Sequence, residues 1–244
     1  MIIGITRVRN EEAIIKNTLD HAAKFVDKII VVDDASTDDT VKICEAHPAV
    51  AEVIRNAFWA SDPKGRRRAE GDLRDWGYQA AIKYNPDWIY YFDADEYIDF
   101  DGIDLNDKNI DYWRVRLFDF YITPEDVNTP YLEREWMGCE YRDIIMLFRP
   151  HFSISFGERE PNLPSYYKGA VGGFCKHYGK AITVEEWEKT CDYYINHRGA
   201  DLYTKFRDKW LARKGKAIHT KSDFNGELIK WEDRKSEKAI PLID

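Results

Sequence analysis

The chain has 244 residues, of which 44% are hydrophobic and 33% are charged, and its formal net charge at pH 7 is −8. A chain of this length and apolar content can bury a core without disulfides or structural metals, and it is too hydrophobic to be disordered. The negative charge argues against a general nucleic-acid binder. No segment approaches the roughly 18 consecutive apolar residues of a membrane span.

The cysteines and the first residues bear on the compartment. The four cysteines form no C-x-x-C pair, and we expect them to be reduced, buried thiols. The chain starts without the basic and apolar regions of a secretory signal. Both observations favour a cytoplasmic location.

The first residues predict strands that alternate with helices. Residues 2–6 form a short apolar run typical of a buried strand. Asn10 stands where the N-cap of a helix belongs, and apolar residues at helical spacing follow it. Residues 29–32 are β-branched, as in a parallel strand covered on both faces. The polar turn 33–38 then caps a second helix that ends near Ala46.

The alternation continues with a weak strand at 53–54, a helix over 74–84 and a strand at 88–92. This order predicts an α/β fold, namely a doubly wound, mostly parallel sheet with helices on both faces. In such sheets ligands bind beyond the carboxyl ends of the strands. The acidic clusters 33–34 and 93–96 both follow predicted strands, so we expect them to line the binding crevice.

The second half of the chain is less regular. Residues 112–118 and 144–148 are predicted strands, and the Gly- and Pro-rich residues 156–173 are predicted to form a long loop. Thr183 and Glu186 form a capping box that starts a helix.

The C-terminal part contains a basic segment with aromatic residues. Residues 203–216 are predicted to form a helix that either faces solvent over an aromatic core face or contacts an anionic membrane. Neither a repeat nor a linker is evident, so we expect one domain over residues 1–244.

The pair Asp93 and Asp95 is the sharpest chemical signal. Two carboxylates two positions apart at a strand end can converge on one hard divalent cation, which can bridge the phosphates of a nucleotide. The alternative is an ordinary acidic turn. Asp33 and Asp34 are similarly ambiguous, because a carboxylate there can accept hydrogen bonds from a base or a ribose, or can belong to a helix-capping turn.

Basic residues lie between the two acidic clusters. Arginines can neutralise a diphosphate through bidentate contacts. Arg74, on the helix that leads to the second cluster, is the better candidate for this role. Residues 66–68 are weaker candidates for it. The alternatives for 66–68 are a solvated loop and a nucleic-acid-binding patch.

The runs RNEEAIIKNTLDHAAKFVDKIIVVDDASTDDT and DWIYYFDADEYI together resemble the family 2 glycosyltransferases of GT-A fold. Within that family the chain is most similar to the small enzymes related to lipopolysaccharide-core β-glucosyltransferases. The resemblance is strong over residues 1–100 and weaker at 147–150, 158–160 and 175–179. It implies a nucleotide-sugar-binding half over 1–100 and an acceptor-binding half with C-terminal helices over 101–244.

The resemblance also implies roles for individual residues. A carboxylate after the 144–148 strand acts as the general base, and Glu160 matches this position, with Glu158 as its rival. Related sequences carry His-Glu there, whereas this chain carries Arg159-Glu160. His177 either completes a Mn²⁺ or Mg²⁺ shell or is structural. The residues implied to bind the donor are Thr6, Arg9, Glu11, Asp33, Asp34, Arg74, Asp93, Ala94 and Asp95, with Asp93 and Asp95 also holding the metal.

The expected activity is a metal-dependent, inverting transfer of a sugar from a nucleotide-sugar donor, foremost a UDP-sugar, to a hydroxyl of a glycan or glycolipid. We expect no nucleic-acid partner and no membrane span. Contact with the inner face of a membrane stays open. A sugar nucleotidyltransferase is an alternative, although no Gly-rich loop follows the first strand. A non-catalytic nucleotide-sugar-binding module is another.

Overall fold

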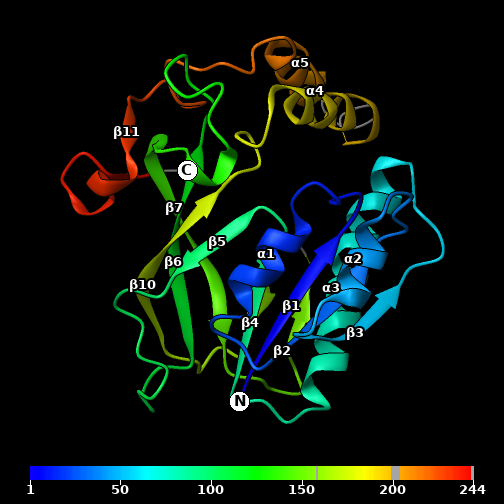
Figure 1. Cartoon of the computed structure of the whole chain (residues 1–244). Coiled ribbons are helices and arrows are strands. Elements are labelled where there is room, and N and C mark those ends of the chain that lie inside the picture. The colour runs from blue at the N-terminus through cyan, green and yellow to red at the C-terminus, as the bar shows by residue number, and fades with distance from the viewer. Residues whose placement is uncertain (158, 199–203, 243–244) are drawn as a thin grey trace. The chain divides into compact units, whose positions relative to one another are not determined.

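The computed structural model of the chain describes residues 1–157, 159–198 and 204–242 (Figure 1). The chain forms two compact units. Unit 1 comprises Met1–Ala60, Lys64–Val115 and Ile144–Phe174. Unit 2 comprises Ser61–Pro63, Arg116–Asp143 and Cys175–Asp244.

The elements follow the predicted alternation. The first eight are β1 (Ile2–Val8), α1 (Ile15–Ala22), β2 (Lys28–Asp33), α2 (Thr40–Ala46), β3 (Val50–Arg55), α3 (Pro63–Ile82), β4 (Trp88–Asp93) and β5 (Glu96–Asp99). They are followed by β6 (Tyr112–Phe120), a 3₁₀ turn (Tyr131–Glu133), β7 (Trp136–Phe148), β8 (Ser155–Phe156), β9 (Pro161–Asn162) and β10 (Gly169–His177). The last are α4 (Val184–Tyr193), a π-helical turn (Tyr194–Arg198), α5 (Thr204–Arg213), β11 (Leu228–Lys230), a 3₁₀ turn (Trp231–Lys235) and β12 (Ile240–Pro241).

The main sheet has the order β3-β2-β1-β4-β7-β6-β10-β5. β1 pairs in parallel with β2 and with β4, and β2 pairs in parallel with β3. β7 runs antiparallel to β4. In this register Val8 lies beside Asp33 and Arg7 lies beside Asp93, so both acidic strand ends reach the same edge of the parallel strands.

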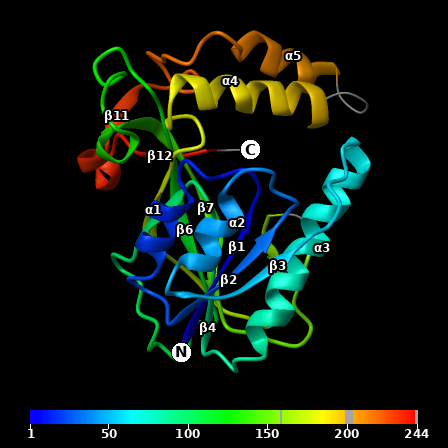
Figure 2. The ribbon, with the colours of Figure 1, turned by 45° about the vertical axis from the view of Figure 1, so that its right-hand side comes forward.

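Helices cover both faces of these parallel strands (Figure 2). Successive residues of a strand point to opposite faces. Gly4 of β1 faces Val26, just after α1, whereas Ile5 faces α3, where a Cβ on Gly77 would lie 2.8 Å from the Ile5 side chain. Glycine at position 77 therefore lets α3 approach the sheet closely. The prediction of an α/β fold with a mostly parallel sheet and helices on both faces is confirmed.

The core of unit 1 is apolar and aromatic. Ile3, Ile5 and Ile30 from the parallel strands are fully buried with Tyr78 of α3. Phe156 of β8 joins the same cluster, which connects this short strand to the central sheet. Burial of each such side chain contributes about 1.5–3 kcal/mol, which accounts for the fixed position of β8.

Several local predictions were wrong. Asn10 does not cap α1, because its backbone is left-handed with φ of 52° and the helix begins five residues later. Helix α3 begins at Pro63, so residues 66–68 belong to a helix and not to a loop. The predicted loop 156–173 contains β9 and the start of β10. In each case the local structure differs from the one that the neighbouring residues alone predicted.

Unit 2 contains the paired helices α4 and α5, which lie side by side in both ribbon views (Figures 1 and 2). The predicted capping box at the start of α4 is confirmed, since the Thr183 side chain accepts a hydrogen bond from the Glu186 amide at 3.1 Å. Trp187 and Trp210 form the centre of the cluster between these helices.

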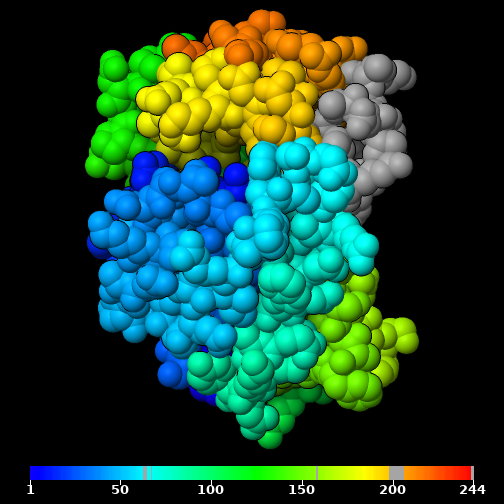
Figure 3. All heavy atoms as spheres, turned by 90° about the vertical axis from the view of Figure 1, so that its right-hand side faces the viewer, coloured from blue at the N-terminus to red at the C-terminus, as the bar shows by residue number. Residues whose placement is uncertain are grey.

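All four cysteines are buried, and none forms a disulfide with another cysteine of the described residues. Among the helices of the described residues, none has the length and apolar character needed to cross a membrane. Figure 3 shows a face on which residues of the blue-to-cyan part of the chain, in unit 1, are exposed.

Candidate active site

Asp34 lies directly after β2 and is fully buried among donors. Its carboxylate pairs with Arg66 of α3 and with Arg7 of β1, at 3.1 Å from the Arg7 Nη1 atom. The Asn56 side chain donates to it at 3.0 Å. Burial by itself would raise the pKa of Asp34, but the hydrogen bond and charge of Arg66, with Asn56 and Arg7, hold that pKa below its ordinary value.

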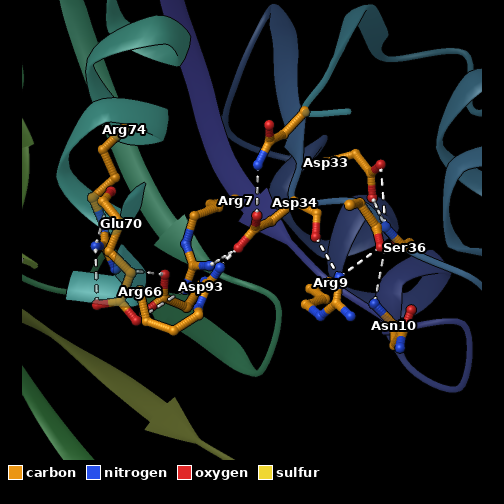
Figure 4. A network of polar contacts seen from close by, with 12 residues as sticks. Arg7, Arg9, Asn10, Asp33, Asp34, Ser36, Arg66, Glu70, Arg74 and Asp93 are labelled. Atoms are coloured by element: carbon orange, nitrogen blue, oxygen red, sulfur yellow. Dashed lines mark hydrogen bonds and ion pairs between the residues drawn. The ribbon is translucent and has the colours of Figure 1, made fainter. Parts of the chain in front are cut away.

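A series of ion pairs runs from Asp34 to the end of β4 (Figure 4). Arg7 lies 4.0 Å from Glu70, which lies 3.9 Å from Arg74. Arg74 reaches to within 4.0 Å of Asp93. The Arg74 Nε atom also donates to the Tyr91 hydroxyl at 2.7 Å, and this hydroxyl donates to Asp93 at 3.3 Å.

The series ends at Arg159, between β8 and β9. Its Nε atom lies 3.2 Å from Asp93, and its Nη2 atom lies 2.6 Å from Glu96. We call these eight residues the charge chain, in which cations and anions alternate. Its members in order are Arg66, Asp34, Arg7, Glu70, Arg74, Asp93, Arg159 and Glu96.

Two arginines of the charge chain, Arg159 and Arg7, are held in the protonated form by their anionic neighbours. Burial would lower the pKa of Arg159, but Glu96, Asp93 and Tyr91 raise it well above its ordinary value. The pKa of Arg7 is likewise raised, because nearby Tyr91 and Glu70 outweigh its burial. The edge of the sheet thus presents fixed positive charge next to the carboxylates that hold it, an arrangement suited to a phosphate ligand.

The turn after β2 carries the other predicted donor residues. Asp33 is fully buried and accepts a hydrogen bond from the Ser36 amide at 3.0 Å. Arg9 donates to the carbonyl oxygens of Asp34 and Ala35, at 2.6 and 2.5 Å, and its guanidinium lies 4.2 Å from the centre of the Trp59 ring. Ala35 has a φ of 57°, a left-handed conformation that costs a non-glycine residue energy and that frequently marks functional turns.

Thr6 and Glu11 flank the same turn. Thr6 is fully buried on β1, and its hydroxyl has no hydrogen-bond partner among the described residues. The Glu11 amide donates to Thr40 at 2.7 Å, which links the loop after β1 to the start of α2. Unit 1 therefore brings together the donor residues that the resemblance implied. Of the basic residues 66–68, Arg66 is in the charge chain, Arg68 is exposed, and the Arg67 side chain lies outside the described residues.

The fit of a divalent cation depends on the turn that joins β4 to β5. Asp93 and Asp95 stand on either side of the buried Ala94, and their oxygens are the ligands that Mg²⁺ and Mn²⁺ prefer. No group of three or more His, Cys, Asp or Glu residues able to hold a metal occurs among the described residues. The two carboxylates suit a divalent cation in their chemistry, and Asp93 is at present paired with Arg159.

Glu160 adjoins Arg159 and is anchored in unit 1. Both of its oxygens pair with Arg114, at 3.1 and 3.0 Å, and one accepts from the Ile145 amide at 2.8 Å. About two thirds of its side chain is buried. Glu158 lies outside the described residues.

His177 lies in unit 2, in a separate ionic cluster around Asp119. Its Nδ1 atom is 2.5 Å from Asp119, and Lys180 bridges Asp119 and Asp223 at 2.8 and 2.7 Å. Burial would raise the pKa of Asp119, but Lys180, His177 and Arg142 hold it well below its ordinary value. This cluster supports the structural alternative for His177, while its role as a metal ligand stays a prediction.

We expect Asp119→Asn to lower the free energy of unfolding at pH 7 by about 3–5 kcal/mol, because it breaks a buried ion pair. A carboxylate with a depressed native pKa stabilises the fold above its unfolded pKa, near 3.8, and this contribution is lost as the pH falls through the lower native value. The difference between wild type and variant should therefore shrink below about pH 4. Urea unfolding at pH 7 and pH 3 measures it, and an equal difference at both pH values would contradict the assignment.

Comparison with known proteins bears on these same residues. Residues 5–104 match the family model described as glycosyl transferase family 2. Over this segment the chain is similar to glycosyl transferase family 2. The matched segment contains both acidic strand ends and all of the charge chain except Arg159.

Two curated relatives of this chain are uncharacterized proteins of Mycobacterium tuberculosis and Mycobacterium bovis. Each is 36% identical over 147 residues, which cover 59% of this chain and 33% of the relative. The match thus spans about a third of the length of these relatives. Among solved structures, Staphylococcus aureus TarS in complex with UDP is similar at 16% identity, with a TM-score of 0.45, over 87% of this chain and 70% of that chain.

Sequence reasoning missed some residues of this site. It assigned no role to Arg7, which follows the predicted strand 2–6, and it placed Tyr91 only in a strand. An arginine that adjoins an apolar strand needs a carboxylate partner when it is buried, and that rule was a usable signal. The sequence around Glu70 contains no motif that indicated a role for this residue in the site. Arg159 was noticed only because it replaces an expected histidine.

Proposed function

We propose that the chain is an inverting glycosyltransferase that moves a sugar from a nucleotide-sugar donor to a hydroxyl acceptor. One observation carries this proposal: the segment that matches glycosyl transferase family 2 is the segment whose strand ends bring Asp34, Arg7, Arg74 and Asp93 together. We further propose that the nucleotide-sugar-binding half consists mainly of residues 1–100 and that the acceptor-binding half lies within residues 101–244.

The donor diphosphate would lie along the arginines of the charge chain, and the nucleoside would lie at the turn after β2. Guanidinium groups match the geometry of phosphate oxygens, and they are already charged and fixed here. Asp33 would accept hydrogen bonds from the base or ribose once the Asp33–Ser36 contact opens. Thr6, Arg9 and Glu11 would surround the same group.

Asp93 and Asp95 would hold a divalent cation, Mn²⁺ or Mg²⁺. Such a cation supplies counter-charge to the departing diphosphate. Because Arg159 pairs with Asp93, the cation and this guanidinium would share one carboxylate.

Glu160 would act as the general base. In an inverting displacement the acceptor hydroxyl gives its proton to the base, its oxygen forms a bond to the anomeric carbon, and the bond from that carbon to the diphosphate breaks. Arg114 holds the carboxylate of Glu160 in place. One of its oxygens would have to turn from Arg114 to the acceptor for this step.

We propose a glycan or glycolipid as the acceptor and the cytoplasmic face of a membrane as the place of reaction. Support comes from α5 and the residues after it, where Arg207, Lys209 and Lys214 are exposed beside the exposed Leu211. Basic and apolar side chains together favour contact with anionic lipid.

The proposal is tested by a thermal-shift screen of UDP-, GDP- and dTDP-sugars, each with and without Mn²⁺. A ligand that binds only the native state raises the Tm by mass action, so the true donor should give the largest shift, and we expect this to be a UDP-sugar. Turnover of that donor in a hydrolysis assay separates an enzyme from a binding module. If no nucleotide sugar shifts the Tm, the proposed function is wrong.

A further inference from the structure

Arg159 stands out among the charged residues because its position is fixed from two sides. Its neighbour Glu160 is tied to Arg114 and to the Ile145 amide, and the β8–β9 pair closes the loop on which both residues lie. The Arg159 guanidinium itself lies 4.9 Å from the centre of the Tyr91 ring. A guanidinium held this way cannot turn freely.

The hydrogen-bond donors of Arg159 are only partly used. A guanidinium carries five N–H donors. Nε and Nη2 reach Asp93 and Glu96, at 3.2 and 2.6 Å, whereas Nη1 is buried and has no hydrogen-bond partner among the described residues. The Nε atom of Arg7, in the same charge chain, is in the same situation.

Buried donors without acceptors are rare in proteins, and each calls for an explanation. For a charged group the cost of leaving one unsatisfied exceeds that of a neutral amide. Two such donors at one edge of the sheet, both on arginines, indicate an anion that the protein itself does not supply. A phosphate group, which accepts several hydrogen bonds from guanidinium groups at once, has the required chemistry.

We infer that Arg159 binds the diphosphate of the donor and positions it at the end of β4. This inference rests on the proposed function. Arg159 is a positioning residue whose guanidinium is held by Asp93, Glu96 and Tyr91 and directed to the phosphate oxygens. The arginine thus takes a direct part in donor binding at the position where a histidine was expected.

The test compares the affinities of UDP and uridine, because only UDP carries the diphosphate. For Arg159→Gln we expect the Kd of UDP to rise about 10-fold or more, as for the loss of a hydrogen bond between charged groups, while the Kd of uridine changes less than about twofold. Arg159→Lys, which keeps the charge but not the fork of donors, should recover only part of the UDP affinity. Lys83→Gln, which removes an exposed cation just after α3, is the matched control for net charge and should bind UDP like the wild type.

Calorimetry of UDP binding is carried out with Mn²⁺ and again with EDTA. We expect Arg159→Gln to lose the same UDP affinity under both conditions. A loss that disappears in EDTA would mean that Arg159 acts only through a metal site, which overturns the inference. Equal losses of UDP and uridine would indicate a general structural role and overturn it as well, as would wild-type UDP affinity in Arg159→Gln. If the wild-type protein binds no nucleotide at all, it is the proposed function that fails.

Discussion

Asp95→Asn should reduce kcat by about 10²-fold or more and leave the fold intact. Asp95 lies in the turn between β4 and β5, half-buried, and outside the cluster of apolar side chains that forms the core of unit 1. The diphosphate gains negative charge as the sugar departs, and a cation held by Asp93 and Asp95 would offset it. Counter-charge of this kind contributes several kcal/mol to the transition state, and about 1.4 kcal/mol corresponds to each factor of ten in rate.

Calorimetry of UDP binding with and without Mn²⁺ locates the defect. The Mn²⁺-dependent part of the binding should be lost in Asp95→Asn, and the metal-independent part should remain. Asp104→Asn removes an exposed carboxylate in the loop after β5 and serves as the control for a change of net charge. Undiminished metal-dependent binding in Asp95→Asn would disprove the role of this motif.

Glu160→Gln should lower kcat by about 10²-fold or more while the Kd of the donor stays unchanged. The amide cannot take up a proton, so the step that needs a base is lost. Its oxygen can still accept from the Ile145 amide, so the loop keeps its anchor. A fall in kcat without a change in donor affinity is the signature of a group that acts in the transition state.

Glu158→Gln is the matched comparison, because it makes the same change two positions away. Near-normal turnover in Glu160→Gln together with an inactive Glu158→Gln would move the base to residue 158. Activity in both variants would assign the base elsewhere. Asp143, which lies 3.9 Å from Arg116 in unit 2, is the next carboxylate to replace.

The sequence was sufficient to predict the parallel strands. Residues 29–32 and 88–92 are continuous apolar runs that end abruptly in carboxylates, and a run of this kind fits a strand buried on both faces. Since all carboxyl ends of parallel strands reach one edge, the meeting of Asp34 with the Asp93 region followed from topology alone. The ion pairs that join them did not, because they depend on side chains from α3.

The placement of Arg159 could not be predicted. It lies 63 positions from Glu96, and its loop is brought to the end of β4 by the packing of Phe156 into the core and by the contacts of Glu160 with Arg114 and the Ile145 amide. Asn10 shows a second reason why local sequence alone does not predict the structure. Its residue type suits an N-cap, but the side chain instead accepts a hydrogen bond from the Thr37 amide at 2.8 Å, which joins the loops after β1 and β2. A partner distant in sequence outweighed the local preference.

The alternation of the charge chain restricts how this site can evolve. Each interior member neutralises two neighbours, so a single substitution leaves an uncompensated charge in a largely buried series. Substitutions within the chain are therefore energetically coupled and do not add. Evolutionary change at positions such as 7, 34, 70 and 74 has to proceed through paired exchanges. Homologous proteins should therefore differ there by co-varying pairs and seldom by isolated replacements.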